Sequence, residues 1–548
     1  MPLIAVFGAW LILAAMFGGL AHGTEYRAAA IEHVCVTPVG DVTNASYAAG
    51  IMHANLDILA PKVAAAAADG ADLVVLSEMA MTSLNFERAQ MALFLTALPD
   101  AHTNANPCTG PPSSVLALQV FQRLACVARD NNVYLVANWG DRFACPYPGT
   151  QPCPLDGHLQ FNTELAFAPT GALIGKYFKR HTFNATEFDT PVGYPPVFFE
   201  MTPPRTPQPT TPTGVAPVRI GLAVCFDSMY PDPVLPLLHD YNVSDFVFSH
   251  WWVDQYASMA ATPWFTSLSR TLGINIVFAA SVWERIFPWG SGSGIVARGV
   301  PVNTTYRTGH LGVVPGNDIL LTGNLVSISG AAPLADVLPR YTAPIVDRVK
   351  PLPMCIADVD VTADELNNAG ESGIPIRHEV TCQKLTCNLT ATVSRAMTTS
   401  DASARWVLMA AYGYYHMADG GGVYYYEDFC GFFQCNSHIP SADCLAKHWH
   451  SIDDDRGGRP FVKIDLIMNA AIGSMPFVMA ISGDGTVAPD YNTTTSVRYA
   501  APSLLAGLPV EGPTRSSPVA VGTASPTENM LGTSLLARSY ELDMRVEP

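Results

Sequence analysis

The run Leu73-Val74-Val75-Leu76-Ser77-Glu78 decides the fold class, because it reads as a short apolar strand that ends in a carboxylate. An Ala-rich segment with apolar residues at helical spacing, residues 47–68, precedes it and ends at a turn of Asp and Gly. Before that segment lies another apolar stretch, residues 28–36. Residues 28–76 therefore predict a strand, a helix and a buried strand in succession.

The same alternation recurs up to about residue 280. Further helices are predicted at residues 115–129, 233–238 and 264–272, and further strands at residues 133–137, 219–224, 246–248 and 274–280. Alternating strands and helices predict an α/β fold. Continuous apolar strands flanked by helices predict a sheet that is covered on its faces. Two loops, at residues 139–160 and 202–217, interrupt the pattern.

The character of the sequence changes near residue 330. Later segments are strand-rich, with Gly and Pro breaks and closely grouped cysteines, at residues 389–393, 406–411, 423–426 and 461–467. We therefore expect four parts: a signal peptide at 1–23, an α/β domain at 24–330, a smaller β-rich domain at 331–500 and a Pro/Ser-rich tail at 501–548. The tail is expected to wrap the surface or to be disordered.

Composition excludes two classes of protein. Charged residues make up 14% and apolar residues 49% of the 548 residues, whereas disordered chains have low hydrophobicity and many charges. The net charge of −17 argues against a nucleic-acid partner, since a basic surface is needed to neutralise phosphates. We interpret the acidic balance as a solubility feature.

The N-terminus predicts a secretory route. Residues 3–21 are apolar, and the small residues Ala21 and Gly23 suit cleavage by signal peptidase before Thr24. An uncleaved signal anchor is the alternative, because such a run can also span a membrane. We expect no membrane span after signal removal and a secreted, extracellular protein, since cysteines and glycosylation sequons agree with that route. The sequons are at Asn44, Asn184, Asn242, Asn303, Asn388 and Asn492.

Three polar residues follow predicted strands of the α/β part. Glu78 ends the strand before it, Lys179 follows a strand that ends near residue 174, and Cys225 follows the strand at 219–224. In α/β sheets, functional sites gather beyond the carboxyl ends of strands. Each residue alone also fits a structural role: a solvated turn glutamate, a surface lysine, or an inert or disulfide-bonded core cysteine.

Together the three resemble the nitrilase, or carbon–nitrogen hydrolase, superfamily, which has Glu, Lys and Cys in that order on three strand ends. Further segments resemble the vanin/biotinidase branch: residues 126–141, 161–163, 225–227 with 232–233, 292–295, and the spacings Cys382…Cys387 and Cys430…Cys435…Cys444. The match covers roughly residues 26–500. It implies an α-β-β-α sandwich as the catalytic domain and a smaller, mainly β, vanin-type C-terminal domain.

The resemblance implies a thiol amidohydrolase without a cofactor. Cys225 would attack an amide carbonyl, Glu78 would act as general base, and Lys179 would stabilise the oxyanion. The nearby ammonium is expected to lower the pKa of the thiol. Two supporting roles follow: Glu187 would be a second carboxylate, and one of Trp251 and Trp252 would face the pocket. A plain core position is the alternative for either tryptophan.

The substrate class implied is a small-molecule linear amide. A pantetheinase-like cleavage of pantetheine to pantothenate and cysteamine is favoured. Biotinidase-type release of biotin from biocytin is the alternative, and a catalytically inactive binding glycoprotein is a third reading. The sequence leaves the choice of amide and the oligomeric state open.

Other polar clusters predict no metal or phosphate site. Residues 447–450 and 453–455 contain His and Asp, which can bind metals, but a solvated loop is favoured because nothing fixes a ligand geometry. The Gly/Ser run at 290–294 lacks the following Lys and helix of a phosphate-binding loop, so a tight loop is favoured.

The cysteine count adds a constraint. Twelve cysteines less the nucleophile leave eleven, so one more thiol must be free or pair between chains, and Cys35 in the first strand is the candidate. We expect two disulfides in the first domain, Cys145 with Cys153 and Cys108 with Cys126. Three more are expected in the second domain, with connectivity left open, among Cys355, Cys382, Cys387, Cys430, Cys435 and Cys444.

Overall fold

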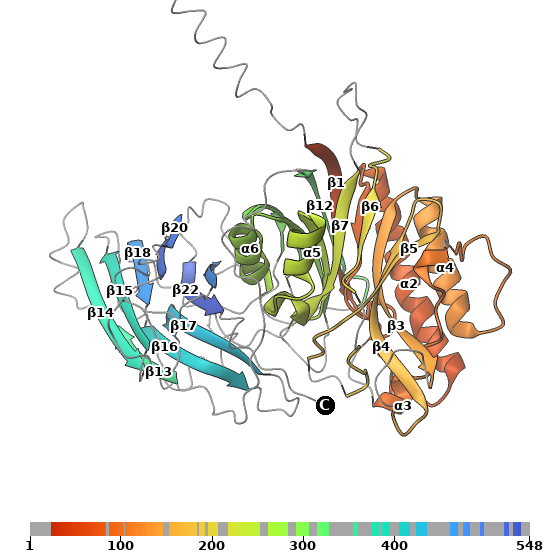
Figure 1. The fold of residues 1–548 in the computed structure, drawn as a ribbon, viewed down its shortest axis with the longest axis horizontal. Helices are drawn as coiled ribbons and strands as arrows, with labels where there is room; N and C mark the ends of the chain where they lie inside the picture. The colour runs from red at the N-terminus through yellow and green to blue at the C-terminus, as the bar shows by residue number, and fades with distance from the viewer. Residues whose placement is uncertain are drawn as a thin grey trace, which may run out of the picture.

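A computed structural model gives the fold. It describes residues 23–327 apart from the segments 84–86, 104, 146–152, 184–185, 192–194, 206–216, 253–260, 283–291 and 306–314. Beyond residue 327 it describes ten strands that lie between residues 354 and 538. Figure 1 shows the two parts, an α/β sandwich and a β-only part that packs on its α6 side.

The alternation predicted from the sequence is confirmed. The observed elements are β1 (Thr24–Val34), α2 (Ala45–Ala68), β2 (Leu73–Val75), α4 (Leu116–Asp130), β3 (Tyr134–Ala144), β7 (Val218–Val224), α5 (Val234–Tyr241), β8 (Asp245–His250), α6 (Ala261–Leu272) and β9 (Asn275–Val282). The loop expected at 139–160 is narrower than predicted, because β3 continues to Ala144 and β4 begins at His158. Antiparallel pairing of β3 with β4 extends both strands into that segment.

The remaining elements of the α/β part complete the sheet and its ends. They are α3 (Arg88–Met91), the 3-10 turns η1 (Ala101–Thr103) and η2 (Cys225–Met229), β4 (His158–Phe167), β5 (Leu173–Phe178), β6 (Phe198–Met201), β10 (Gly294–Ala297), β11 (Val300–Thr304) and β12 (Ile319–Ser327). Among the described residues the strand order is β5-β4-β3-β2-β1-β9-β8-β7-β6. The neighbouring strands in the middle of this order are parallel to one another, so their carboxyl ends point the same way. They are β3, β2, β1, β9, β8 and β7.

The sheet folds into two facing halves with helices outside. Alternate residues of β1 separate the two cores: Ala28 and Ala30 face the other half of the sheet, whereas Ala29 and Ile31 pack with α2 and α4. A Cβ added at Gly175 on β5 would lie 3.1 Å from the side chain of Leu222 on β7, so the halves meet closely there. Helices α5 and α6 cover the second half, which completes the predicted α-β-β-α sandwich (Figure 1).

The C-terminal part is two antiparallel sheets. One has the order β13 (Met354–Val359), β16 (Arg405–His416), β17 (Tyr424–Cys435), β22 (Met530–Arg538) and β19 (Met475–Ser482). The other has the order β14 (Ile374–Cys382), β15 (Leu385–Val393), β18 (Phe461–Met468), β21 (Ala520–Ala524) and β20 (Thr494–Val497). The mainly β character predicted for this part is confirmed.

Residues after 500 were expected to wrap the surface or to be disordered, but two segments of this region are strands within the sheets. β22 lies between β17 and β19 and pairs with both, and β21 pairs with β18 and β20. Strand pairing over this sequence distance depends on partners that local composition does not reveal. The Pro/Ser-rich residues 498–519 lie outside the described residues.

Four disulfides lie among the described residues. Cys108 is bonded to Cys126 and Cys145 to Cys153, the two pairings expected for the first domain. In the C-terminal part, the bonds Cys355–Cys382 and Cys387–Cys430 each join one five-stranded sheet to the other. Cys444 lies outside the described residues and Cys435 is described by its backbone alone, so the third C-terminal bond stays a prediction.

Cys35 and Cys225 are the free cysteines of the described chain, and both are buried. Burial raises the pKa of Cys35 to about 12, so that thiol stays protonated as a small apolar core residue does. None of the helices in the described part of the chain combines the length and the hydropathy needed to span a membrane.

Candidate active site

Glu78, Lys179 and Cys225 meet at the carboxyl edge of the sandwich. Glu78 follows β2, Lys179 directly follows β5, and Cys225 directly follows β7. β2 and β5 belong to one half of the sheet and β7 to the other, so the site lies where the two halves face each other. All three residues are buried, with 3% to 5% of their surface exposed.

The carboxylate of Glu78 is the centre of the hydrogen bonds at this site. Its Oε1 accepts from Lys179 Nζ at 2.7 Å and from Asn162 Nδ2 at 2.8 Å. Its Oε2 accepts from the backbone N–H of Trp251 at 2.9 Å, and the Cys225 thiol is also a hydrogen-bond partner of the carboxylate. A carboxylate held by a cation and two N–H groups is fixed in place and remains able to accept a proton.

The charges of this group set the resting state of the thiol. Burial and the negative charge of Glu78 raise the pKa of Cys225, and the Lys179 ammonium only partly offsets them. The ammonium lowers the pKa of the thiol as expected, but burial and the carboxylate raise it by more, so the net shift is upward. Burial by itself lowers the pKa of Lys179, but the negative charges of Glu78, Cys225 and Asp227, together with the hydrogen bond to Glu78, outweigh burial and raise it. The resting site thus holds a neutral thiol beside a Glu–Lys ion pair.

Cys225 lies on a sharp turn between β7 and η2. Its φ is +46°, in the left-handed region that costs a residue with a side chain roughly 1–2 kcal/mol. Asp227 holds this turn to the segment after β5: its Oδ2 accepts from the N–H of Val224 at 3.0 Å, and its Oδ1 accepts from the N–H of His181 at 2.9 Å. The carboxylate thus fixes the position of the thiol relative to Lys179. Strained, well-anchored turns of this kind present nucleophiles in other enzymes.

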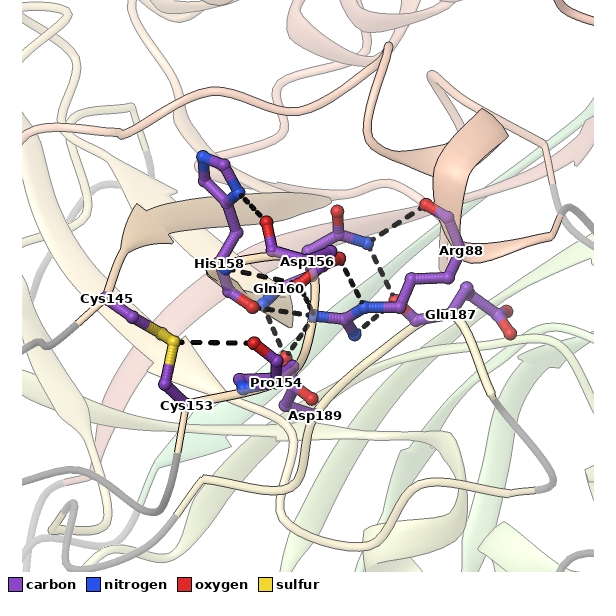
Figure 2. A network of polar contacts seen from close by, with 9 residues as sticks. All are labelled: Arg88, Cys145, Cys153, Pro154, Asp156, His158, Gln160, Glu187 and Asp189. Carbon is purple, nitrogen blue, oxygen red and sulfur yellow. Dashed lines mark hydrogen bonds and ion pairs between the residues drawn. A yellow bond between two sulfur atoms is a disulfide. The ribbon is translucent and has the colours of Figure 1, made fainter.

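Glu187 lies next to the same charges. Burial raises the pKa of its carboxyl, and the charges of both Lys179 and Glu78 act on it. Its main chain is held by Arg88 and Gln160, which donate to the Glu187 carbonyl at 3.4 Å and 2.9 Å. Figure 2 shows its carboxylate pointing away from the Arg88 guanidinium.

Arg88, the first residue of α3, is itself fixed by several acceptors. It donates to Asp156 at 2.8 Å, to Asp189 at 2.9 Å and to the carbonyl of His158 at 2.7 Å (Figure 2). The Cys145–Cys153 disulfide lies beside this network, with Cys153 three residues before Asp156. The sequence reasoning missed Arg88, since neither charge nor spacing distinguishes it from a surface arginine.

The two tryptophans after β8 take different positions. Trp252 is buried and stacks on Trp264 of α6 at 6.4 Å between ring centroids, so it is a core residue. Trp251 contributes its main chain to the site, where its N–H donates to Glu78 and its carbonyl lies 3.5 Å from the Cys225 sulfur.

A second row of polar side chains lies behind Glu78, and the sequence reasoning assigned it no role. Asn162 donates to Glu78, Asn138 donates to Asn162 Oδ1 at 2.8 Å and to Glu164 Oε2 at 3.0 Å, and Ser249 contacts Glu164. Asn162 lies in residues 161–163, one of the segments that carried the family resemblance, and that resemblance could have marked it as a site residue. Glu164 and Ser249 sit in apolar strands, where alternation alone does not mark them.

The other predicted positions lie away from this site. Asn44 caps the start of α2 by accepting from the Tyr47 N–H and is exposed, as is Asn242. Asn303 and Asn388 are half-buried, and Asn184 and Asn492 lie outside the described residues. The His/Asp segments at 447–450 and 453–455 also lie outside them.

Comparison with known proteins shows what this chain is similar to. The model of the carbon–nitrogen hydrolase family matches residues 45–261. Pantetheinase from Mus musculus is 30% identical over 300 residues, which cover 53% of this chain and 55% of that protein. Biotinidase from Rattus norvegicus is 31% identical over 275 residues, which cover 49% of this chain and 50% of that protein. The chain therefore spans about half the length of the curated relatives it matches.

A solved structure of an amidase from Nesterenkonia sp. is also similar, with 16% identity and a TM-score of 0.35, over 56% of this chain and 94% of that chain. The family match covers β2, β5 and β7, and so includes the strands that precede Glu78, Lys179 and Cys225. Residues 45–261 thus resemble the carbon–nitrogen hydrolase family, and this part of the chain is similar to pantetheinase and biotinidase.

Proposed function

We propose that the protein is a thiol amidohydrolase that cleaves a linear carboxamide through a thioester acyl-enzyme. The observation that carries the proposal is the contact between a free buried thiol, a carboxylate and an ammonium at the carboxyl edge of the sandwich. An amide is a poor electrophile with a poor leaving group, so a nucleophile, a base and a charged oxyanion partner are the groups that its hydrolysis needs.

In the acylation step, the sulfur of Cys225 attacks the carbonyl carbon while the Glu78 carboxylate takes the thiol proton. A base is needed because the raised pKa keeps the thiol protonated at rest. The carbonyl electrons move to oxygen, and the Lys179 ammonium, helped by a backbone N–H after Cys225, stabilises that oxyanion. The C–N bond then breaks, and protonated Glu78 gives its proton to the departing amine.

In the deacylation step, water replaces the amine. Glu78 takes a proton from the water as it attacks the thioester carbon, and the second oxyanion is held by the same donors. The C–S bond breaks, the sulfur recovers the proton from Glu78, and the carboxylic acid leaves. Glu187 supports this cycle as a second carboxylate beside Lys179 and Glu78.

Pantetheine is the favoured substrate and biocytin the alternative. Relatives named pantetheinase and relatives named biotinidase are about equally identical to this chain, at 30% and 31%, so identity does not separate the two. Both substrates are linear amides that the same three residues can attack. The choice depends on the pocket walls formed by loops.

The test is an assay of the full chain on pantetheine and biocytin side by side, together with iodoacetamide labelling and peptide mapping. We expect release of cysteamine or of biotin, and stoichiometric labelling of Cys225. Cys35→Ser is the matched control, because it removes the second free buried thiol of the described residues and should leave both readouts intact. Cleavage of neither amide, or turnover that persists in Cys225→Ser, would refute the proposal.

We also propose that the protein is secreted and glycosylated. Its disulfides are typical of proteins from oxidising compartments, and Asn44 and Asn242 are exposed and so accessible to glycosylation. Expression in a secreting eukaryotic cell should yield protein in the medium whose mass falls on treatment with an N-glycosidase. Retention of all the protein inside the cell would contradict this.

A further inference from the structure

Glu164 is a fully buried carboxyl group that the proposed mechanism does not use. It lies on β4, in the row of side chains behind Glu78, and its neighbours Asn138 and Ser249 are also fully buried. Its Oε2 accepts one N–H of Asn138 at 3.0 Å, and the other N–H of that amide goes to Asn162 Oδ1. Asn162 in turn donates to Glu78, so a continuous chain of hydrogen bonds joins the two carboxyl groups.

A count of protons at Ser249 fixes the state of Glu164. The hydroxyl oxygen of Ser249 lies 2.6 Å from the carbonyl oxygen of Leu76 and 2.5 Å from Glu164 Oε1. Two oxygens at such distances need a proton between them. A carbonyl can only accept, so the single Ser249 proton goes to Leu76. The proton between Ser249 and Glu164 must then belong to Glu164.

We propose that Glu164 is a neutral carboxylic acid that donates to Ser249 and, through Asn138, holds the Asn162 amide on Glu78. Glu164 is thus a positioning residue for the general base of the proposed function. Its Oε1 carries the proton, and its Oε2 acts as the acceptor that orients the Asn138 amide. Glu164 Oε1, Glu164 Oε2 and Asn138 Nδ2 then each have a partner of the matching kind.

The surrounding charges agree with a neutral acid. Burial is the main cause that raises the pKa of Glu164, to about 8, and the negative charges of Glu78 and Asp227 add to it. Opposite Glu164 on β5 lies Tyr177, whose hydroxyl bonds to Asp227 rather than to Glu164. A second carboxylate charge here would repel the thiolate and the oxyanion that form during attack.

The first experiment reads the proton directly. A difference infrared spectrum of the wild type minus Glu164→Gln, at pH 6, should contain the carbonyl band of a neutral carboxylic acid, and the band should disappear as the pH rises through about 8. Subtraction removes the other buried carboxyl groups, which both proteins share. A spectrum without this band at pH 6 would overturn the inference whether or not the enzyme cleaves amides.

The second experiment uses the pH profile of kcat/KM. The Glu164→Gln side chain can donate to Ser249 and accept from Asn138, so this variant should keep its activity near pH 7. The fall of kcat/KM on the alkaline side of the profile should then occur at a higher pH than in the wild type. Glu164→Leu removes the acceptor of Asn138 and should lower kcat about 100-fold with little change in KM. Glu200→Gln, an exposed glutamate on β6, is the matched control and should leave the profile unchanged.

Ser249→Ala gives the sharpest discrimination. If Glu164 donates to Ser249, losing the acceptor destabilises the neutral acid and the alkaline limb moves to lower pH. If Ser249 instead donates to a carboxylate, the limb moves to higher pH and the inference is wrong. An unchanged limb in both Glu164→Gln and Ser249→Ala would also overturn it. If Glu164→Leu fails to fold, Glu164→Gln and Ser249→Ala still test whether Glu164 is a neutral acid. If neither amide is cleaved, the infrared result tests Glu164 alone.

Discussion

Replacing Lys179 with Met should weaken the fold and the proposed reaction by separable amounts. The Lys179 Nζ and Glu78 Oε1 atoms are 2.7 Å apart, and both side chains are about 5% exposed or less. At an effective dielectric constant of about 20, that separation corresponds to an attraction of about 6 kcal/mol. The variant no longer bears the cost of burying an ammonium, so the expected loss of unfolding free energy is smaller, about 3–5 kcal/mol.

The activity loss has a different origin. Lys179 would stabilise the oxyanion, and losing one such donor costs about 3–4 kcal/mol in a hydrolase, or roughly 100- to 1000-fold in kcat. Urea unfolding followed by fluorescence measures the first quantity, and kcat on the cleaved amide measures the second. In Lys179→Met the carboxylate of Glu78 is buried without its cation, which is why the stability falls.

The double variant Glu78→Gln/Lys179→Met separates the two effects. It removes both charges, so most of the lost stability should return, because replacing a whole buried pair is often neutral. Its activity should stay lost, since both the base and the oxyanion partner are gone. If Lys179→Met unfolds at the same urea concentration as the wild type, the buried ion pair does not stabilise the fold as argued. If the double variant turns over substrate, Glu78 is not the base.

Three further substitutions test separate parts of the structure. Cys225→Ser should abolish turnover and iodoacetamide labelling while the urea midpoint stays nearly unchanged, because sulfur and oxygen differ little in volume; retained turnover would contradict the mechanism. Arg88→Met should lower kcat more than it changes KM, because the main chain that carries Glu187 loses a hydrogen-bond donor. Arg88→Lys should recover part of the lost kcat. If Arg88→Met lowers kcat equally in a variant that already carries Glu187→Gln, Arg88 acts through another residue. Replacing Cys387 and Cys430 with serine removes their disulfide and should lower the unfolding free energy of the C-terminal sheets by about 2–4 kcal/mol. Iodoacetamide labelling of Cys225 should stay unchanged. Lost labelling would mean that the site depends on those sheets.

The order of elements in the α/β part could be predicted because it depends on local pattern. Helix α2 follows from apolar residues at helical spacing, such as Leu56, Leu59 and Val63, and β2 follows from the short apolar run before Glu78. The positions of Glu78 and Cys225 after strands follow from the same pattern, whereas β5 runs to Phe178, past the end predicted near residue 174. What the pattern did not contain was the pairing of β21 and β22 with strands far away in the chain.

The sequence by itself determined which residue types stand at the strand ends, and hence the kind of chemistry they can support. Only the tertiary structure decided their state. The thiol is neutral because folding buries it beside Glu78, and the ammonium stays charged because folding brings the same carboxylate to 2.7 Å. Glu164 is one glutamate among many in the sequence, and it becomes a neutral acid because Ser249 and Asn138 reach it from other strands. Residue identity is local, whereas desolvation and charge coupling depend on neighbours that only the folded chain brings together.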